Sequence, residues 1–218
     1  EILLDENEDF EIIEDIKIEN SQFKNDIRQF NILQKNLETV FDFVEPTESN
    51  KQVYSLQLRN IILLASMEVE VHWQKLLKNN GYKKSRLTTK DYVRLCEFIN
   101  FKNEFKLTSF PEFGSISPFN NWDSALPTKS LDWYDAYNKI KHDRSSNLHL
   151  ATFELAISSV SAVLTLLNIR YGNTNVEKII NNNLFSTIKY AYPSKYYHTK
   201  VFYEFNKSLK FKKYFVEE

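Results

Sequence analysis

Residues 54–77 read YSLQLRNIILLASMEVEVHWQKLL and carry apolar side chains on nearly every face of a helical wheel. A helix that is apolar all round is normally covered by its neighbours, so we expect this one at the centre of a helical bundle. The residues Asn79-Asn80-Gly81 that follow are typical of a helix C-terminus, because asparagine and glycine tolerate a left-handed cap. The stretch therefore predicts the fold class, a mainly α, up-down helical bundle.

Four polar residues interrupt this apolar stretch, and each would cost free energy if it were buried without a partner. Arg59 and Glu70 share one face, and Glu68 lies one turn before His72. Two interpretations stay open. The residues form a structural ion pair or polar network that joins helices, or Arg59 and Glu70 support a catalytic site.

Apolar residues spaced by three and four extend the bundle on both sides. The spacing predicts helices over about 22–44, from Thr88 or Thr89 to about Asn103, over 133–144, over about 147–170, and near 176–184. Only three glycines and five prolines in 218 residues favour long helices over a sandwich or barrel with many tight turns.

Residues 107–130 show no clear period and are too apolar to be left in water. Compact domains rarely carry so long a loop without a function, so we expect it to fold back over the bundle as a packed cover.

The two ends of the chain differ from its middle. Residues 1–20 carry nine acidic side chains and one lysine, and we expect an acidic arm before a bundle over 21–184. Over 185–218 the period shifts to two, which predicts a small β-hairpin and tail packed on the same domain. Basic residues alternate with tyrosines there, and the lysines proposed to bind nucleic acid are Lys195, Lys200 and Lys207. The alternative is that these lysines only solvate the hairpin or pair with the acidic arm.

Composition excludes several functional classes. Lys and Arg number 28 and Asp and Glu 29, so the net charge of −1 does not favour binding of nucleic acid or membrane over the whole surface.

The single cysteine, Cys96, lies in an apolar-periodic stretch where we expect it to be buried. No disulfide can form within the chain and no run approaches the ~18 apolar residues of a spanning helix, so we expect a cytoplasmic protein with no membrane partner. No phosphate loop, dinucleotide fingerprint, HExxH or cysteine pair is present, and we expect no metal and no cofactor.

The candidate site is residues 133–144, WYDAYNKIKHDR. Two arcs form on a helical wheel at about 100° per residue. The packing arc comprises Trp133, Ala136, Tyr137 and Ile140. The polar arc comprises Tyr134, Asn138, Lys141 and His142.

The polar arc holds the groups that RNA cleavage without a metal needs. In that reaction the 2′-hydroxyl loses a proton, the 5′-oxygen gains one, and the charge on phosphorus is neutralised. His142 would act as general acid/base, Lys141 and Arg144 would hold phosphate, and Asn138 would orient it. The alternative is an ordinary solvated helix end, with cations interacting with the helix dipole.

The run WYDAYNKIKHDR, with FELAISSVSAVLTLL after it and SPFNNW and LRNIILLASMEVEVHWQKLL before it, resembles helical-bundle proteins of the HEPN superfamily over roughly residues 50–170. This resemblance implies an RNase of a toxin–antitoxin, abortive-infection or other phage-defence system. Active members carry an arginine, a polar residue and, a few positions later, a histidine, and two copies form a composite site. The resemblance therefore implies a homodimer.

Two alignments with this pattern are available. In the first, Asn138 takes the polar position, His142 the histidine, and Tyr137 stands where active members carry arginine. Tyrosine is neutral near pH 7, so either Lys141 and Arg144 substitute for the guanidinium or the chain is not a nuclease. In the second, Arg144 and His149 form the pair, which requires a helix break near Ser145-Ser146. We prefer His142, because Asn138 lies one turn away on its face, and keep His149 in reserve.

The sequence thus predicts a metal-independent RNase of bacterial defence, with Glu70, Arg59 and Tyr137 in support and RNA as its partner. The rival hypothesis is a catalytically silent module that dimerises or binds nucleic acid, an antitoxin or another defence protein.

Overall fold

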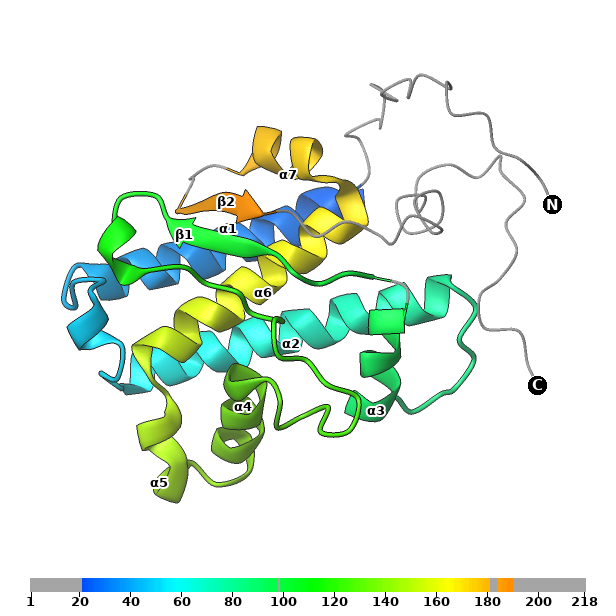
Figure 1. The fold of residues 1–218 in the computed structure, drawn as a ribbon, viewed down its shortest axis with the longest axis horizontal. Helices are drawn as coiled ribbons and strands as arrows, with labels where there is room; N and C mark the ends of the chain where they lie inside the picture. Colours follow the sequence, from blue (N-terminus) through cyan, green and yellow to red (C-terminus); the bar gives the residue numbers. More distant parts are fainter. Residues whose placement is uncertain (1–20, 98, 181–183, 190–218) are drawn as a thin grey trace.

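The computed structural model describes residues 21–97, 99–180 and 184–189, which form a mainly helical structure with one small sheet (Figure 1). The helices are α1 (Ser21–Phe41), α2 (Leu56–Asn79), α3 (Thr89–Tyr92), α4 (Asp132–His142), α5 (Arg144–Asn147), α6 (Phe153–Tyr171) and α7 (Asn173–Ile179). The 3₁₀ turns are η1 (Glu48–Asn50), η2 (Val93–Glu97), η3 (Pro111–Phe113) and η4 (Leu148–Leu150). The strands are β1 (Glu104–Leu107) and β2 (Phe185–Lys189).

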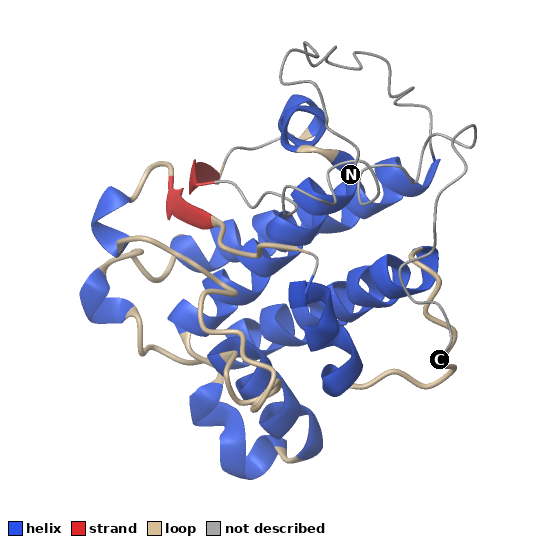
Figure 2. Cartoon of the chain, turned by 45° about the vertical axis from the view of Figure 1, so that its right-hand side comes forward, coloured by secondary structure: helices blue, strands red, loops and turns tan. Residues whose placement is uncertain are grey.

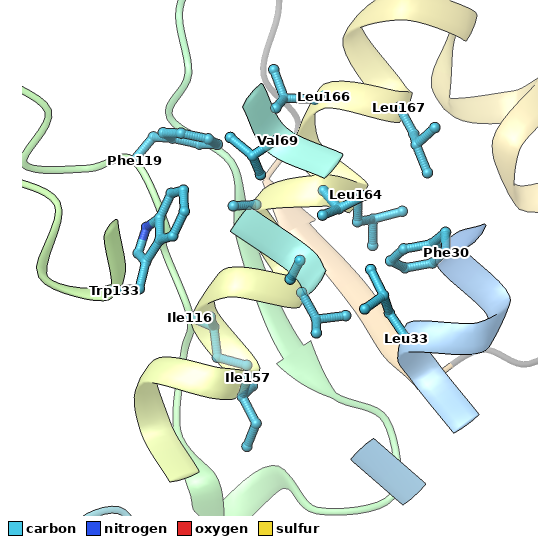
Figure 3. Packing of buried hydrophobic residues seen from close by; sticks show 14 of the residues in the cluster. Phe30, Leu33, Val69, Ile116, Phe119, Trp133, Ile157, Leu164, Leu166 and Leu167 are labelled. Atoms are coloured by element: carbon cyan, nitrogen blue, oxygen red, sulfur yellow. The ribbon is translucent and has the colours of Figure 1, made fainter. Parts of the chain in front are cut away.

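Helix α6 lies at the centre of the fold, and every residue from Ser159 to Tyr171 is buried. Helices α1, α2, α4 and α7 pack against it (Figure 1). Figure 3 shows Phe30 and Leu33 of α1 beside Leu164 of α6. The helix over 54–77 does pack against α1, α3, α4 and α6, but the expectation that its neighbours cover it on every side is wrong. Helix α2 leaves one apolar face exposed, because α6, which is more uniformly apolar, occupies the interior.

The expectation that no stretch approaches a membrane-spanning helix is wrong by length and composition: helix α6 is long and apolar enough to cross a membrane, with a mean hydropathy of 1.4 over its best window. Of that window, 83% is buried inside the fold. Packing against the neighbouring helices accounts for its composition.

The long segment before α4 is a packed cover, as predicted. Phe113, Ile116 and Phe119 are buried, and the indole of Trp133 donates a hydrogen bond of 2.8 Å to the carbonyl of Pro118. Figure 3 shows Phe119 beside Trp133, with ring centroids 5.8 Å apart. The segment therefore supplies core side chains to α4 rather than forming a solvated loop.

The third predicted helix is shorter than expected. Thr88 and Asp91 form a capping box, so the predicted start is right, but the α-helix ends at Tyr92 and continues only as η2. Cys96, which was expected to be buried, is exposed, because the 3₁₀ turn does not keep the side-chain directions of an α-helix.

The structure describes only the beginning of the predicted C-terminal hairpin. A strand does form over Phe185–Lys189, but its antiparallel partner is β1, with Phe105 opposite Thr187 and Leu107 opposite Phe185. Phe105 and Leu107 are buried, because a strand conformation lets them alternate inward between the helix predicted to end near Asn103 and the aperiodic segment 107–130. Residues 190–205, assigned to the rest of the hairpin, lie outside the described part of the chain, as do the acidic arm 1–20 and most of the tail.

A buried polar network joins α1, α2 and α6. Arg170 donates to Asp26 over 2.7 Å and to Nδ1 of His72, and the hydroxyl of Tyr171 donates to Asp26 over 2.6 Å. Asp26, His72, Arg170 and Tyr171 are each at most 5% exposed. The interpretation of His72 as part of a network joining helices is confirmed, with Asp26 and Arg170 as its partners.

His72 is held in its neutral form. Burial lowers its pKa to about 3, and the neighbouring Arg170 cation acts in the same direction. Because Nδ1 accepts from Arg170, the ring proton lies on Nε2, a buried atom without a hydrogen-bond partner in the described structure. Burial opposes ionisation of Asp26, but the hydrogen bond from Tyr171 and the Arg170 and Lys75 cations lower the carboxyl pKa.

We expect the free energy of unfolding to rise with pH between about 3 and 6.5. Below 6.5 the unfolded histidine gains a proton, whereas His72 in the fold stays neutral down to about 3. The unfolded state then binds more protons, so lowering the pH to 5 should cost about 2 kcal/mol. Urea unfolding across this range measures the slope.

The matched variant is His72→Gln, whose amide oxygen can still accept from Arg170 but does not titrate. It should lose that part of the slope, whereas the exposed His149→Gln should keep it. Equal slopes for wild type and His72→Gln would contradict the assignment.

Candidate functional site

Helix α4 positions the predicted site residues. The packing arc lies inward as expected, with Trp133, Tyr137 and Ile140 at most 2% exposed. Lys141 and His142 are exposed at the C-terminal end of the helix. Tyr134, assigned to the polar arc, is instead buried, because its ring packs edge-on against Trp73 with centroids 5.3 Å apart.

A hydrogen-bonded network connects α2 to the exposed end of α4. The hydroxyl of Tyr134 donates to a Glu70 carboxylate oxygen over 2.7 Å, and Nζ of Lys141 donates to the hydroxyl of Tyr137 over 2.9 Å. The Lys141 ammonium also lies 5.0 Å from the centroid of the Tyr137 ring. Of the predicted supporting residues, Glu70 and Tyr137 are thus brought to the site.

The network fixes charge states at this end of α4. Burial raises the pKa of Tyr134 and Tyr137, and the nearby Glu70 carboxylate adds to the rise in both. The hydrogen bond to Tyr137 raises the pKa of Lys141. At neutral pH the site therefore presents two neutral phenols and a lysine held as a cation.

Asn138 and Arg59 are placed differently from the prediction. The Asn138 amide donates to the carbonyl of Tyr134 over 2.8 Å, within its own helix, and no hydrogen bond joins it to His142 in the described residues. Arg59 donates to Asn60 over 3.1 Å, and its Nε is buried without a hydrogen-bond partner among residues 21–97, 99–180 and 184–189. No described hydrogen bond connects Arg59 to Glu70.

The chain breaks its helix immediately after His142. Asp143 is extended, with φ −143° and ψ 92°, and its carboxylate accepts from the backbone N–H of Ser146 over 3.2 Å to cap α5. Hydrogen bonds from Ser146 lower the pKa of the Asp143 carboxyl. Asn147 donates to the carbonyl of Asp143 over 2.9 Å and fixes the turn.

The break comes before Arg144 and so does not fall between Arg144 and His149, where the second alignment requires it. Arg144 lies in α5 and His149 in η4, and both are exposed. The site thus becomes a short exposed segment, the α4–α5 turn (residues 141–149), which carries Lys141, His142, Arg144 and His149.

Two other predictions concern the lysines of the C-terminal tail and the absence of a metal. Lys195, Lys200 and Lys207 lie outside the described residues. Within the described ranges, no group of three or more His, Cys, Asp or Glu side chains is arranged to hold a metal ion.

The contact between Glu70 and Tyr134 could not be found from either helix alone, because the residues are 64 positions apart. The available signal was the spacing of Tyr134, Tyr137 and Lys141 at i, i+3 and i+7, which places them along one side of α4.

Comparisons with known proteins add no family assignment. No protein-family model matches the chain, and neither a curated protein nor a solved structure matches it significantly.

We expect Tyr134→Phe to lower the free energy of unfolding by about 1.5–3 kcal/mol, the range for a hydrogen bond to a charged group. The variant keeps the ring against Trp73 and removes only the hydroxyl that binds Glu70. Urea denaturation measures the change, with the exposed Tyr54→Phe as control.

A cycle with Glu70→Ala, which removes the acceptor, separates the pair from other effects. The two substitutions should not add, because each removes the same bond. Simple additivity would show that Glu70 and Tyr134 contribute independently.

Proposed function

We propose that the chain is a metal-independent ribonuclease of the HEPN type that acts in bacterial defence through its α4–α5 turn. The supporting observation is that two exposed imidazoles and two exposed cations lie on nine consecutive residues, on a turn fixed by Asp143 and Asn147. An imidazole can move protons near neutral pH, and exposed cations can bind phosphate.

In the proposed reaction, the neutral imidazole of His142 removes the proton from a ribose 2′-hydroxyl. The resulting oxygen attacks the adjacent phosphorus, and the bond to the 5′-oxygen breaks. A protonated imidazole, from His149 or from a second copy of the chain, returns a proton to the leaving oxygen. The products are a 2′,3′-cyclic phosphate and a free 5′-hydroxyl, so neither water nor metal is consumed.

Lys141 and Arg144 would neutralise the phosphorane. Tyr137 accepts a hydrogen bond from Lys141 and so limits the positions its ammonium can take. Glu70, bonded to Tyr134 on the same helix, helps hold α4 against α2. Preorganised charge of this kind is usually a large part of catalysis, because it needs no rearrangement during the reaction.

One observation favours the rival function, a catalytically silent binding module. Tyr137 stands where the resemblance expects arginine, and it is only 1% exposed. It therefore contributes to packing and cannot contact a substrate phosphate directly. In this alternative the exposed cations of the α4–α5 turn bind RNA or an acidic protein without cleaving it.

A second copy of the chain is the partner we propose for the exposed face of α2. Leu56, Leu64 and Met67 are 56%, 47% and 54% exposed, and Val71 continues the same face at 39%. These four residues form an uncharged stripe on α2. The same stripe on two copies of the chain can meet across a two-fold axis without like-charge repulsion. Glu70 lies roughly 60° around the helix from Met67, so such a dimer would bring the α2 edges that carry Glu70 near each other.

We expect the purified full chain to cleave single-stranded RNA in EDTA and to leave 2′,3′-cyclic ends. His142→Ala should reduce the rate by about 10²–10⁴, as expected for loss of a general acid or base. Gel analysis of end-labelled RNA measures both. Lys139→Ala is the matched control, because Lys139 is an exposed lysine of α4 paired with Asp135.

His149→Ala distinguishes the two alignments: a loss in His149→Ala but not in His142→Ala supports Arg144–His149 as the active pair, whereas a loss in both supports His149 as the general acid that acts with His142. Full activity in both histidine variants would contradict the nuclease proposal. Intact RNA with wild type, together with RNA binding that Lys141→Glu abolishes, would identify the silent module instead.

We expect Met67→Glu to convert a dimer to a monomer, because it places a charge in the centre of the stripe. Light scattering after size exclusion measures the mass over a range of concentrations. Ile32→Glu is the control, since Ile32 is an exposed apolar residue, 44% exposed, on α1 and outside the stripe. A monomeric wild type at every concentration would contradict the proposal.

A further inference from the structure

A second candidate site lies between α1, α6, α7 and β2, on the other side of the helices from the α4–α5 turn (Figures 1 and 2). It is a partly open cavity of about 230 Å³. The described residues that line it are Gln34, Thr108, Leu164, Asn168, Glu177, Ile180, Phe185, Ser186 and Thr187.

Two buried carboxamides line this cavity. Gln34 of α1 is 2% exposed, and Asn168 of α6 is 4% exposed. The side-chain oxygen of Asn168 is buried and has no hydrogen-bond partner within the described structure. Gln34 donates one long hydrogen bond, 3.3 Å, to Asn31. An unpaired buried acceptor costs about 1–3 kcal/mol, so a ligand donor that reached Asn168 would recover free energy.

The walls and rim restrict the ligand further. Leu164, Ile180 and Phe185 give an apolar wall, and Phe185 supplies an aromatic ring. The hydroxyls of Thr108 and Ser186 hydrogen-bond to each other over 2.8 Å at the β1–β2 edge. Glu177 is the only charged residue among the described lining residues, so these residues offer no cation to hold an anionic group such as phosphate.

We propose that this cavity binds a neutral purine base or nucleoside. A carboxamide offers a donor and an acceptor side by side, which matches the N6 and N7 edge of adenine. The apolar wall suits the face of the ring. The volume lies below the ~300 Å³ at which pockets for drug-sized ligands begin, so a single base fits and an oligonucleotide does not. This proposal does not depend on the ribonuclease proposal, because it uses none of the residues of the α4–α5 turn.

The test is calorimetric titration of the full chain with adenine, adenosine, adenosine monophosphate and uridine. We expect adenine and adenosine to bind and to raise the melting temperature. The monophosphate should bind at least about tenfold more weakly, because the described lining residues offer its phosphate no cation, and uridine likewise, because it lacks the purine edge.

Asn168→Leu should weaken adenosine binding at least about tenfold, because it removes the buried amide. Thr187→Trp tests the cavity independently: it narrows the rim without changing a buried residue and should also weaken binding. Gln29→Leu, which removes an exposed amide of α1 outside the cavity, should have no effect.

Three results would overturn the proposal: no binding by either purine at about 10 mM, far above the range of specific sites; binding that survives both cavity variants; or equal affinity for uridine. Because RNA cleavage is measured separately at the α4–α5 turn, failure of this proposal and failure of the ribonuclease proposal are distinguishable.

Discussion

The rest of the structure depends on the burial of α6 on all its sides. A 19-residue helix with almost no polar face must be covered by other helices, and α1, α2, α4 and α7 do so. Its one buried cation, Arg170, then has to be neutralised away from water. Asp26 of α1 does this, and His72 of α2 accepts a second hydrogen bond, so one guanidinium fixes the relative positions of three helices.

The position of the candidate site follows from how α4 packs on this core. Trp73 of α2 is fully buried, and its ring lies 4.9 Å from that of Trp122, and 5.3 Å from that of Tyr134. These rings pack against the inner side of α4, and the buried Tyr137 lies on that side as well. The polar residues Lys141 and His142 are left at the end of the helix, where Asp143 turns the chain. Exposure of the proposed catalytic groups is thus a consequence of aromatic packing one to two turns earlier.

The sequence predicted the long helices well, because their spacing is set by burial on one or more faces. The helices expected over about 22–44 and 147–170 correspond to Ser21–Phe41 and Phe153–Tyr171. It failed where pairing is long-range. Nothing local shows that Phe105 pairs with Thr187, 82 positions away, or that Arg170 meets Asp26. The sequence predicted which charged residues lie in the α4–α5 turn. It did not predict where the helix ends, because that end depends on Asp143 capping α5.

Tyr137 decides how the site can work. A guanidinium at this position would be almost fully buried and would lie beside Lys141, so the two cations would raise each other's free energy unless Glu70 neutralised one. A tyrosine removes that conflict and accepts a hydrogen bond from the lysine. The cation available to a phosphate is then an exposed ammonium, a point charge, rather than a planar bidentate group. In the proposed ribonuclease, such a site would hold RNA with less geometric selectivity, and discrimination between substrates would have to come from Arg144, from the proposed second copy, or from the shape of the α4–α5 turn.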